Sequence, residues 1–380
     1  MATHTTRLGL GERDRNLARP AMRRNPVDCK NSNRDNALKP ALKQTTTNAL
    51  VTNKAYDLRV RKVAALKPSS IANVPYAKKE TAEPSKKKKT TDVVEDLTSK
   101  LQNISVEDID EDDKENPLLC SEYINDIYAY MKIMEIEYRV DADYIKKKTD
   151  ITDRMRGILV DWLIQVHLKF KLLQETLYLT VAILDRYLSV TDIKRDKLQL
   201  TGVTCMLIAS KFEEIYAPEV NDFVYITDNA YTFQNILDME INVLNTLEFD
   251  LNHPLPLHFL RRNSKAGNAD GKVHTLGKYL TEICLTHMSM LKFKPSELAA
   301  GAFLVAQHVL MPDKKWNSTL THYTGYTRDM ALVPAKAICE LVIRAEKSKH
   351  QAVRNKYSSS KFMSVSSLDE LERVHDILEE

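Results

Sequence analysis

In this chain of 380 residues, few charged side chains lie close enough together in the sequence to suggest a catalytic acid–base pair. Glu213 and Glu214 form one close pair shortly after Lys211, at the expected end of a helix. A solvated face or a contact with a partner protein is favoured there over acid–base catalysis. No nucleotide-binding, serine-nucleophile or zinc-protease motif occurs, and nine glycines leave little for phosphate-binding loops. The sequence therefore predicts a protein that is not an enzyme.

The five cysteines show no C-x-x-C pair and no histidines at metal-ligand spacing. Their odd number and wide separation favour reduced intracellular thiols, so neither a metal nor another cofactor is expected. The first residues lack the apolar stretch of a signal peptide, and no apolar run is long enough to span a bilayer. We therefore expect a soluble protein of the cytoplasm and nucleus that does not bind membranes.

The segment 155–167 is apolar on nearly every side, yet it contains Arg156 and Asp161. A helix without a polar face predicts the buried axis of an all-helical domain. A charge inside such a helix needs a partner, because an unpaired buried charge is very costly. The segment therefore predicts both an all-α architecture and a buried ion pair.

Hydrophobic periodicity predicts two series of helices, and no alternating strand pattern is convincing. The first series is expected at 121–137, 152–169, 174–189, 196–212, 218–226 and 232–248. The second is expected at 256–263, 272–291, 295–310, 316–323 and 328–347. Pro254 and Pro256 separate the two series, because proline is excluded from a helix interior.

Residues 1–100 carry 22 Lys/Arg and 10 Asp/Glu, a net charge of +12 in a chain whose total is +3. Such a stretch buries too little apolar surface to fold, so a disordered basic tail is expected. The predicted divisions are a tail at 1–104, helical units at 121–252 and 253–350, and an extension at 351–380.

Met-Arg-Gly-Ile-Leu-Val-Asp-Trp-Leu at 155–163 resembles the cyclin box signature. Leu184-Asp185-Arg186-Tyr187-Leu188 and Lys211-Phe212-Glu213-Glu214-Ile215-Tyr216 fit the same pattern further along. The segments Ser105–Asp110, Pro254–Arg262 and Ala352–Tyr357 resemble the B-type mitotic cyclins. The resemblance covers about residues 105–362 in consistent order. It implies two tandem five-helix cyclin-box folds behind the tail.

The resemblance implies a regulatory subunit that binds and activates a cyclin-dependent kinase at the G2/M transition. Lys211 and Glu240 match the family positions that hold the kinase's mobile helix and the segment beside it. Phe212, Glu213 and Tyr178 are further expected kinase contacts. Activation would then require only preferential binding of the active kinase conformation.

Two further sets of residues follow from the same resemblance. Arg156 and Asp185 match a structural ion pair that ties two helices together. The expected docking groove for substrates with Arg-x-Leu motifs consists of Met155, Ile158, Leu159, Trp162, Gln165, Leu198 and Gln199. Gln165 stands where other cyclin classes carry an acid, which should weaken recognition of the motif's arginine. Gly157 replaces the more usual alanine and is expected to widen the groove.

Arg261, His274 and Lys278 are a candidate phosphate-binding set, since His274 and Lys278 lie four residues apart on one helix face. Ordinary surface charge is the alternative for these three residues.

Two sequences resemble degradation signals read by the anaphase-promoting ubiquitin ligase. Arg7, Leu10, Gly11 and Asn16 outline an imperfect destruction box, and Lys114-Glu115-Asn116 reads as a KEN motif. Degradation by the ubiquitin–proteasome system at mitotic exit is therefore expected.

The basic tail also raises an alternative, a nucleic-acid-binding transcription factor with cyclin-like repeats, similar to general transcription factor IIB. Such a protein should carry its positive charge on the helical repeats and often has a zinc ribbon. Here the part after residue 100 has a net charge of −9, and the cysteine spacing fits no zinc ribbon. Direct nucleic-acid binding is therefore not expected.

Overall fold

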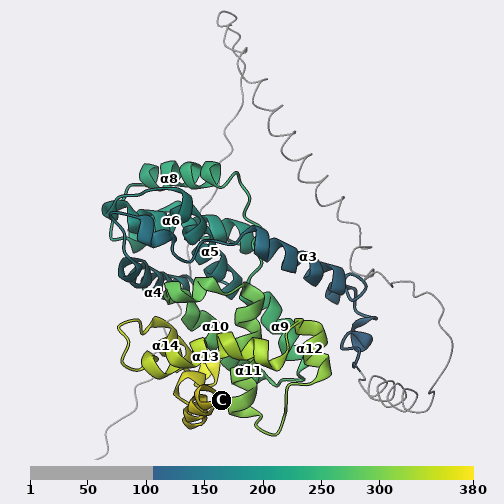
Figure 1. Cartoon of the computed structure of the whole chain (residues 1–380). Coiled ribbons are helices and arrows are strands. Elements are labelled where there is room, and N and C mark those ends of the chain that lie inside the picture. Colours follow the sequence, from purple (N-terminus) through teal and green to yellow (C-terminus); the bar gives the residue numbers. More distant parts are fainter. Residues whose placement is uncertain (1–105) are drawn as a thin grey trace, which may run out of the picture. The chain divides into compact units, whose positions relative to one another are not determined.

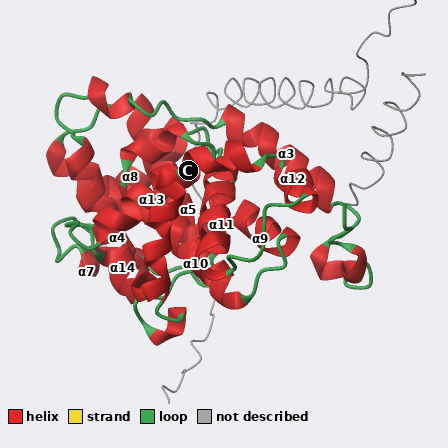
Figure 2. Cartoon of the chain, turned by 60° about the horizontal axis from the view of Figure 1, so that its bottom comes forward, coloured by secondary structure: helices red, strands yellow, loops and turns green. Residues whose placement is uncertain are grey.

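A computed structural model describes residues 106–380, and all regular elements in that range are helices (Figure 2). The predicted all-α class with two helical repeats is confirmed. The predictions for the tail and for Arg7, Leu10, Gly11 and Asn16 lie outside the described residues. No helix within 106–380 is long and apolar enough to cross a membrane.

The helices of the two repeats follow one another along the chain (Figure 1). The first series is α3 (Ile124–Glu137), α4 (Asp153–Phe170), α5 (Gln174–Val190), α6 (Leu198–Glu213), α7 (Val220–Ile226) and α8 (Phe233–Thr246). The second is α9 (Pro256–Ala266), α10 (Gly271–Ile283), α11 (Pro295–Leu310), α12 (Ser318–Thr324) and α13 (Arg328–Ala345). Two short helices, α14 (Ala352–Tyr357) and α15 (Val374–Glu379), come last.

Local sequence accounts for several helix starts. The Thr152 side chain accepts a hydrogen bond from the Met155 amide at 3.3 Å and so caps the start of α4. Pro256 occupies the first turn of α9, where its missing N–H does no harm. The prediction of one helix over 272–291 is wrong, because α10 ends at Ile283. A 3₁₀ turn, Cys284–Thr286, and an extended His287 follow it.

The buried axis of the first repeat is α6, because every residue from Leu200 to Ser210 is buried. The prediction that 155–167 forms this axis is therefore wrong. On α4, Ile158 and Gln165 are exposed, whereas Leu163 and Ile164 are fully buried. An apolar sequence alone does not reveal that one edge of a helix lies beyond its neighbours.

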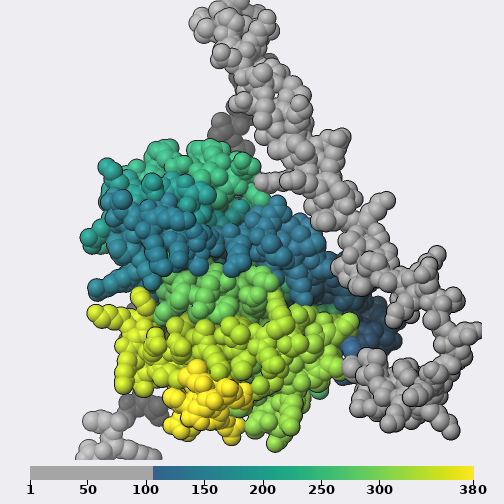
Figure 3. Space-filling view, viewed as in Figure 1, coloured from purple at the N-terminus to yellow at the C-terminus, as the bar shows by residue number. Residues whose placement is uncertain are grey.

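The central helix of the second repeat is α11, which packs against α9, α10 and α13. Gly301 allows close approach to α13, since a Cβ there would lie 2.8 Å from the Ala335 nitrogen. The first-repeat helices and the second-repeat helices meet along a broad boundary (Figure 3).

The α3 helix lies along the second repeat and is attached to it by polar side chains. The Tyr128 hydroxyl donates to the His258 carbonyl at 2.9 Å, and Lys132 donates to the Thr324 carbonyl at 2.7 Å. The buried Glu135 carboxylate accepts from both the amide and the hydroxyl of Ser296, at 2.9 and 2.7 Å. These bonds hold α3 against the end of α12 and the start of α11.

Candidate functional site

Arg156 on α4 and Asp185 on α5 form a fully buried, bidentate ion pair. Nε and one terminal nitrogen of the arginine each lie 2.6 Å from a carboxylate oxygen of Asp185. The Tyr144 hydroxyl donates to the same carboxylate at 2.8 Å. Burial opposes the charge on Arg156, but Asp185 outweighs this effect and raises the pKa of the guanidinium.

The other terminal nitrogen of Arg156 reaches the second repeat, where it donates to the Leu285 carbonyl at 2.8 Å. Asp161, the other charge inside α4, accepts a hydrogen bond from the Ala352 amide at the start of α14, at 2.9 Å. Both charges in the apolar segment therefore have partners, and both connect the first repeat to residues beyond it.

Lys211 at the end of α6 and Glu240 on α8 lie in direct contact, with nitrogen and oxygen 2.6 Å apart. The lysine side chain is 48% exposed and the glutamate side chain 11% exposed, so the pair lies at the edge of the surface. A partner that inserts a backbone or side-chain group here can share or replace this hydrogen bond.

Exposed apolar side chains lie beside this pair. Phe212, adjacent to Lys211, is 52% exposed, and Ile215 and Tyr216 just after α6 are about 90% exposed. Ile241, next to Glu240 on α8, is also exposed. Because α6 and α8 pack together, these four exposed residues all lie within five positions in sequence of one member of the Lys211–Glu240 pair. We call these six residues the α6–α8 face.

Glu213 is half-buried beside this face. Burial, together with the nearby carboxylates of Glu175 and Glu214, raises the pKa of Glu213. Glu214 accepts hydrogen bonds from the Leu173 amide at 2.7 Å and from the Thr176 hydroxyl at 2.5 Å. The paired carboxylates thus include one that caps the start of α5.

The prediction that Tyr178 is a kinase contact is wrong. Its side chain is 2% exposed, and its hydroxyl lies 2.7 Å from the Thr281 hydroxyl of α10. The ring therefore packs inside the junction between the repeats and is closed off from the molecular surface. Burial raises the pKa of this phenol well above its ordinary value.

The structure divides the expected substrate groove into a surface and a floor. Ile158 and Gln165 are exposed, and Met155, Trp162 and Gln199 are half-buried. Leu159 and Leu198 are buried, each 6% exposed, and therefore lie beneath that surface. Gly202 on α6 makes room for Leu159, because a Cβ there would lie 2.9 Å from a leucine methyl carbon.

The expectation that Gly157 widens this groove is wrong. Gly157 is buried on another side of α4, where an added Cβ would lie 3.0 Å from His350 Nε2 and 3.1 Å from the Thr286 carbonyl oxygen. The glycine thus allows α4 to approach the second repeat closely. Gln165 donates to the Asp161 carboxylate at 3.3 Å, so its amide is partly engaged.

Arg261, His274 and Lys278 lie near enough to influence one another's charge, but each is constrained. Arg261 is ion-paired with Glu175 of α5. His274 Nδ1 lies 2.8 Å from the Ser264 hydroxyl, and burial, with the cations Lys278 and Arg261, lowers the pKa of this imidazole to about 4. At neutral pH the set therefore presents two cations, one of which already has an acidic partner.

The KEN motif lies in an ordered turn. Lys114 pairs with Glu111, and the Asn116 side chain accepts from the Leu118 amide at 3.1 Å, which caps the 3₁₀ turn Pro117–Leu119. All three residues of the motif are exposed.

Two buried ion pairs were not predicted. Asp110 pairs with Arg262 of α9, and Glu282 of α10 pairs with Lys356 of α14. Asp110, Arg262 and Lys356 lie in the three segments that resemble B-type cyclins, which is the signal that could have singled them out. No metal-binding cluster occurs among residues 106–380.

Comparison with known proteins agrees with this geometry. Residues 126–252 match the cyclin N-terminal domain, and residues 254–371 match the cyclin C-terminal domain. A viral cyclin structure from herpesvirus saimiri has a TM-score of 0.51 and 21% identity, covering 57% of this chain and 96% of the viral one, and so shares the fold.

Curated relatives are much more similar. The G2/mitotic-specific cyclin-B of Marthasterias glacialis is 50% identical over 295 residues, which is 78% of this chain and 76% of the relative. The G2/mitotic-specific cyclin-B of Patella vulgata is 51% identical over 282 residues, 74% of this chain and 69% of the relative. The family resemblance is thereby confirmed, and the chain belongs to the G2/mitotic-specific cyclin-B family.

Proposed function

We propose that the protein is a regulatory subunit that binds a cyclin-dependent kinase and activates it to drive the G2/M transition. The observation that carries this proposal is the α6–α8 face, where strongly exposed apolar residues lie within a few positions in sequence of an ion pair at the surface edge. Exposed apolar clusters rimmed by polar groups mark protein interaction sites. This chain would contribute no catalytic group, and its role would be to stabilise the active kinase conformation.

The energetic requirement is modest for a protein interface. Moving a kinase from 1% to 99% active requires about 5.5 kcal/mol of preferential binding to the active state. A handful of buried anchors near the centre of an interface, most often Trp, Tyr or Arg, each cost about 2 kcal/mol or more when truncated. Phe212 and Tyr216 are therefore the strongest candidates for apolar anchors, with Lys211 and Glu240 fixing the orientation.

The test is phosphorylation of a histone-type substrate by purified kinase with and without the protein. Lys211→Ala combined with Glu240→Ala should greatly reduce activation. A matched control is Arg344→Ala combined with Glu340→Ala, which removes an exposed ion pair of 3.2 Å on α13 and should leave activation unchanged. Equal activation by all three proteins would refute the proposed kinase face.

Substrate selection and destruction complete the proposed function. The groove formed by Met155, Ile158, Trp162 and Gln165 would receive substrates with Arg-x-Leu motifs. The destruction box at Arg7 and Leu10 would direct ubiquitylation by the anaphase-promoting ligase at mitotic exit, with shuttling between cytoplasm and nucleus before then. Full-length protein should disappear from extracts leaving mitosis, and deletion of residues 1–20 should stabilise it.

The KEN motif is proposed as a second, weaker signal, since its lysine and asparagine side chains are engaged within the turn. Lys114→Ala combined with Asn116→Ala should slow degradation less than Arg7→Ala combined with Leu10→Ala. The reverse order would assign the main signal to the KEN motif.

A further inference from the structure

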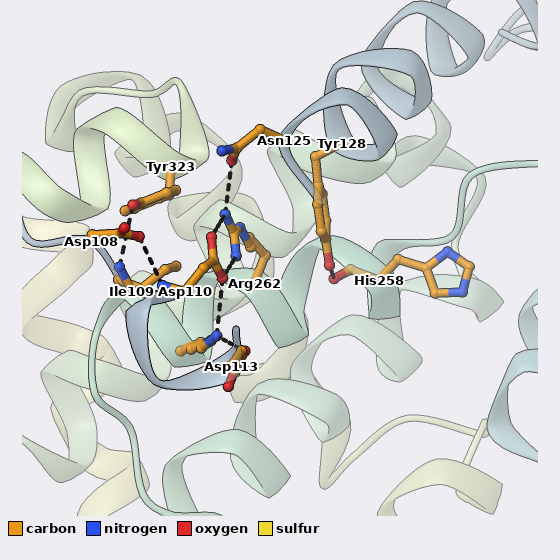
Figure 4. Close-up of polar contacts among 10 residues, drawn as sticks. Asp108, Ile109, Asp110, Asp113, Asn125, Tyr128, His258, Arg262 and Tyr323 are labelled. Atoms are coloured by element: carbon orange, nitrogen blue, oxygen red, sulfur yellow. Dashed lines mark hydrogen bonds and ion pairs between the residues drawn. The ribbon is translucent and has the colours of Figure 1, made fainter. Parts of the chain in front are cut away.

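A basic and aromatic socket is formed by the start of α3 together with α9 and α12 of the second repeat (Figure 4). Arg262 of α9 forms its centre and is only 5% exposed. The guanidinium lies 5.4 Å from the ring centre of Tyr128 and 4.6 Å from that of Tyr323. Asn125 accepts a hydrogen bond from it at 3.0 Å, and Lys265 stands one turn further along α9. We call these five residues the Arg262 socket.

The segment Glu107–Asp113 fills this socket. Asp110 accepts two hydrogen bonds from Arg262, at 2.5 and 2.7 Å, and a third from Lys265 at 3.0 Å. Asp113 forms an ion pair with the same lysine. Two acids three residues apart thus match two cations on one face of α9.

Backbone contacts fix the direction of the segment. The Ile109 amide donates to the Tyr323 hydroxyl at 3.3 Å, and the Glu107 amide donates to the Thr319 hydroxyl at 3.3 Å. Asp108 turns the chain by accepting from the Asp110 amide at 3.0 Å. The segment is therefore bound in the way a peptide ligand would be, by main-chain hydrogen bonds and one buried side-chain anchor.

The buried positive charge of Arg262 requires an anion as its counter-ion. Arg262 is buried, and without Asp110 its charge would lack a counter-ion at a site where solvation is poor. Burial alone would raise the pKa of Asp110, but the hydrogen bonds from Arg262 and Lys265 prevail and hold that pKa below its ordinary value. The planar guanidinium, fixed beside two rings, favours a carboxylate that accepts two parallel hydrogen bonds.

One apolar side chain takes part in the docking, because Ile109 packs against the hydrophobic core. Ile109 is half-buried, and Val106 at the start of the described chain is 40% exposed. Asp110 itself is 6% exposed, so one side chain supplies most of the buried polar contact. A segment that is held mainly by one buried carboxylate can be displaced by another segment that offers the same carboxylate.

We propose that the Arg262 socket is a docking site for an acidic peptide and that this chain's own segment Glu107–Asp113 occupies it in cis. The recognised pattern is an apolar residue followed by an acid, with a second acid three residues later. The site uses none of the residues of the α6–α8 face, the substrate groove or the Arg261 set. Its occupancy joins the chain that precedes α3 to the second repeat.

The first test uses a fluorescent peptide with the sequence of residues 106–116 and the full chain carrying Asp110→Ala. That substitution leaves the socket without its own acid, so the peptide should bind, as measured by fluorescence anisotropy. The unaltered chain should bind it at least about tenfold more weakly, because its socket is filled. Equal binding by both chains, or none by either, would overturn the proposal.

Changes in the peptide supply matched controls that cannot affect folding. A peptide with Asp110→Asn should bind about tenfold or more weakly, since it loses charge-assisted hydrogen bonds to Arg262. A peptide with Asp112→Asn loses the same charge at an exposed position and should bind nearly as well as the original. If both substitutions weaken binding equally, the peptide is held only by nonspecific attraction between opposite charges. The socket would then not recognise the Asp110 position specifically.

A second measurement needs no variant of the protein. Amide exchange at Glu107 and Ile109 in the unaltered chain should accelerate when excess original peptide displaces the segment. The Asp110→Asn peptide should leave that exchange unchanged. If neither peptide changes the amide exchange rates of Glu107 and Ile109, the segment is a fixed part of the fold, and the proposal is overturned.

Discussion

Lys356 of α14 donates two hydrogen bonds to the Glu282 carboxylate of α10, with nitrogen–oxygen distances of 2.6 and 2.9 Å. Both side chains are almost completely buried. The Tyr357 hydroxyl donates to the same carboxylate at 2.9 Å, and Gln174 at the start of α5 donates at 3.0 Å. One carboxylate therefore joins the C-terminal segment to both helical repeats.

Replacing Glu282 by Gln should destabilise the protein strongly. The substitution keeps the shape but leaves the buried Lys356 charge without a counter-ion, which costs about 3–5 kcal/mol. Thermal unfolding should then begin roughly 10 °C lower. Glu340→Gln, at an exposed ion pair, is the control and should change the unfolding temperature little. Equal shifts in the two variants would show that the buried ion pair contributes no more to stability than the exposed one.

Asp185→Ala should also destabilise the fold by about 3–5 kcal/mol, because Arg156 would remain buried and uncompensated. Kinase activation should fall with the folded fraction, and differential scanning calorimetry should show the loss directly. A double variant, Arg156→Met with Asp185→Ala, should recover part of the stability, since it removes the isolated charge. A stable, fully active Asp185→Ala protein would contradict the structural role of the pair.

Most helix positions were predictable because they follow from local patterns, although apolar spacing carried the prediction for α10 past its end at Ile283. The proline pair at Pro254 and Pro256 separates the repeats, and apolar spacing of three and four residues marks the elements between turns. The meeting of Arg156 with Asp185 came from family resemblance, since nothing local links positions 29 residues apart.

Burial at junctions could not be read from the sequence. Tyr178 and Phe212 are both aromatic residues on helices, yet one is enclosed by α10 and the other is exposed. The difference depends on which helix packs over each ring. The same holds for Asp110 and Arg262, which are 152 residues apart and carry no periodic signal.

His253, in the link between the repeats, should make stability depend on pH. Burial, aided by Arg186, lowers the pKa of this imidazole to about 4, below its unfolded value of about 6.5. The folded state therefore keeps the ring neutral, and its contribution to stability is complete above pH 6.5 and is lost as pH falls toward 4. Between pH 7 and pH 5 the loss is about 2 kcal/mol.

His253→Phe checks this linkage. Phenylalanine keeps an aromatic ring beside Tyr138, whose ring centre lies 5.8 Å from that of His253, but it cannot be protonated. Urea unfolding at pH 7 and pH 5 should show a smaller decline for the variant than for the unaltered chain. An identical decline would mean that other groups control the acid sensitivity, such as His167, whose pKa is also lowered to about 4 by burial.

Gln165→Glu should strengthen docking of Arg-x-Leu peptides. Gln165 is exposed on the α4 edge, and a carboxylate there would attract the motif's arginine by about 0.2–1 kcal/mol, up to roughly fivefold in affinity. Fluorescence anisotropy at low and high salt should reveal a tighter and more salt-sensitive complex. A peptide with glutamine in place of the arginine is the control and should bind both proteins alike. If both peptides respond equally, Gln165 does not face the arginine.

Glu175→Gln should improve phosphopeptide binding, because it releases Arg261 from its ion pair and removes a negative charge from the site. Lys278→Ala should weaken binding several-fold through loss of one phosphate contact. The unphosphorylated peptide controls for contacts unrelated to the phosphate. Since His274 has a pKa of about 4, lowering the pH from 7.5 to 6 should not increase affinity through this residue. Calorimetric titration of both variants tests the set, and unchanged affinity in Lys278→Ala would exclude it as a phosphate site.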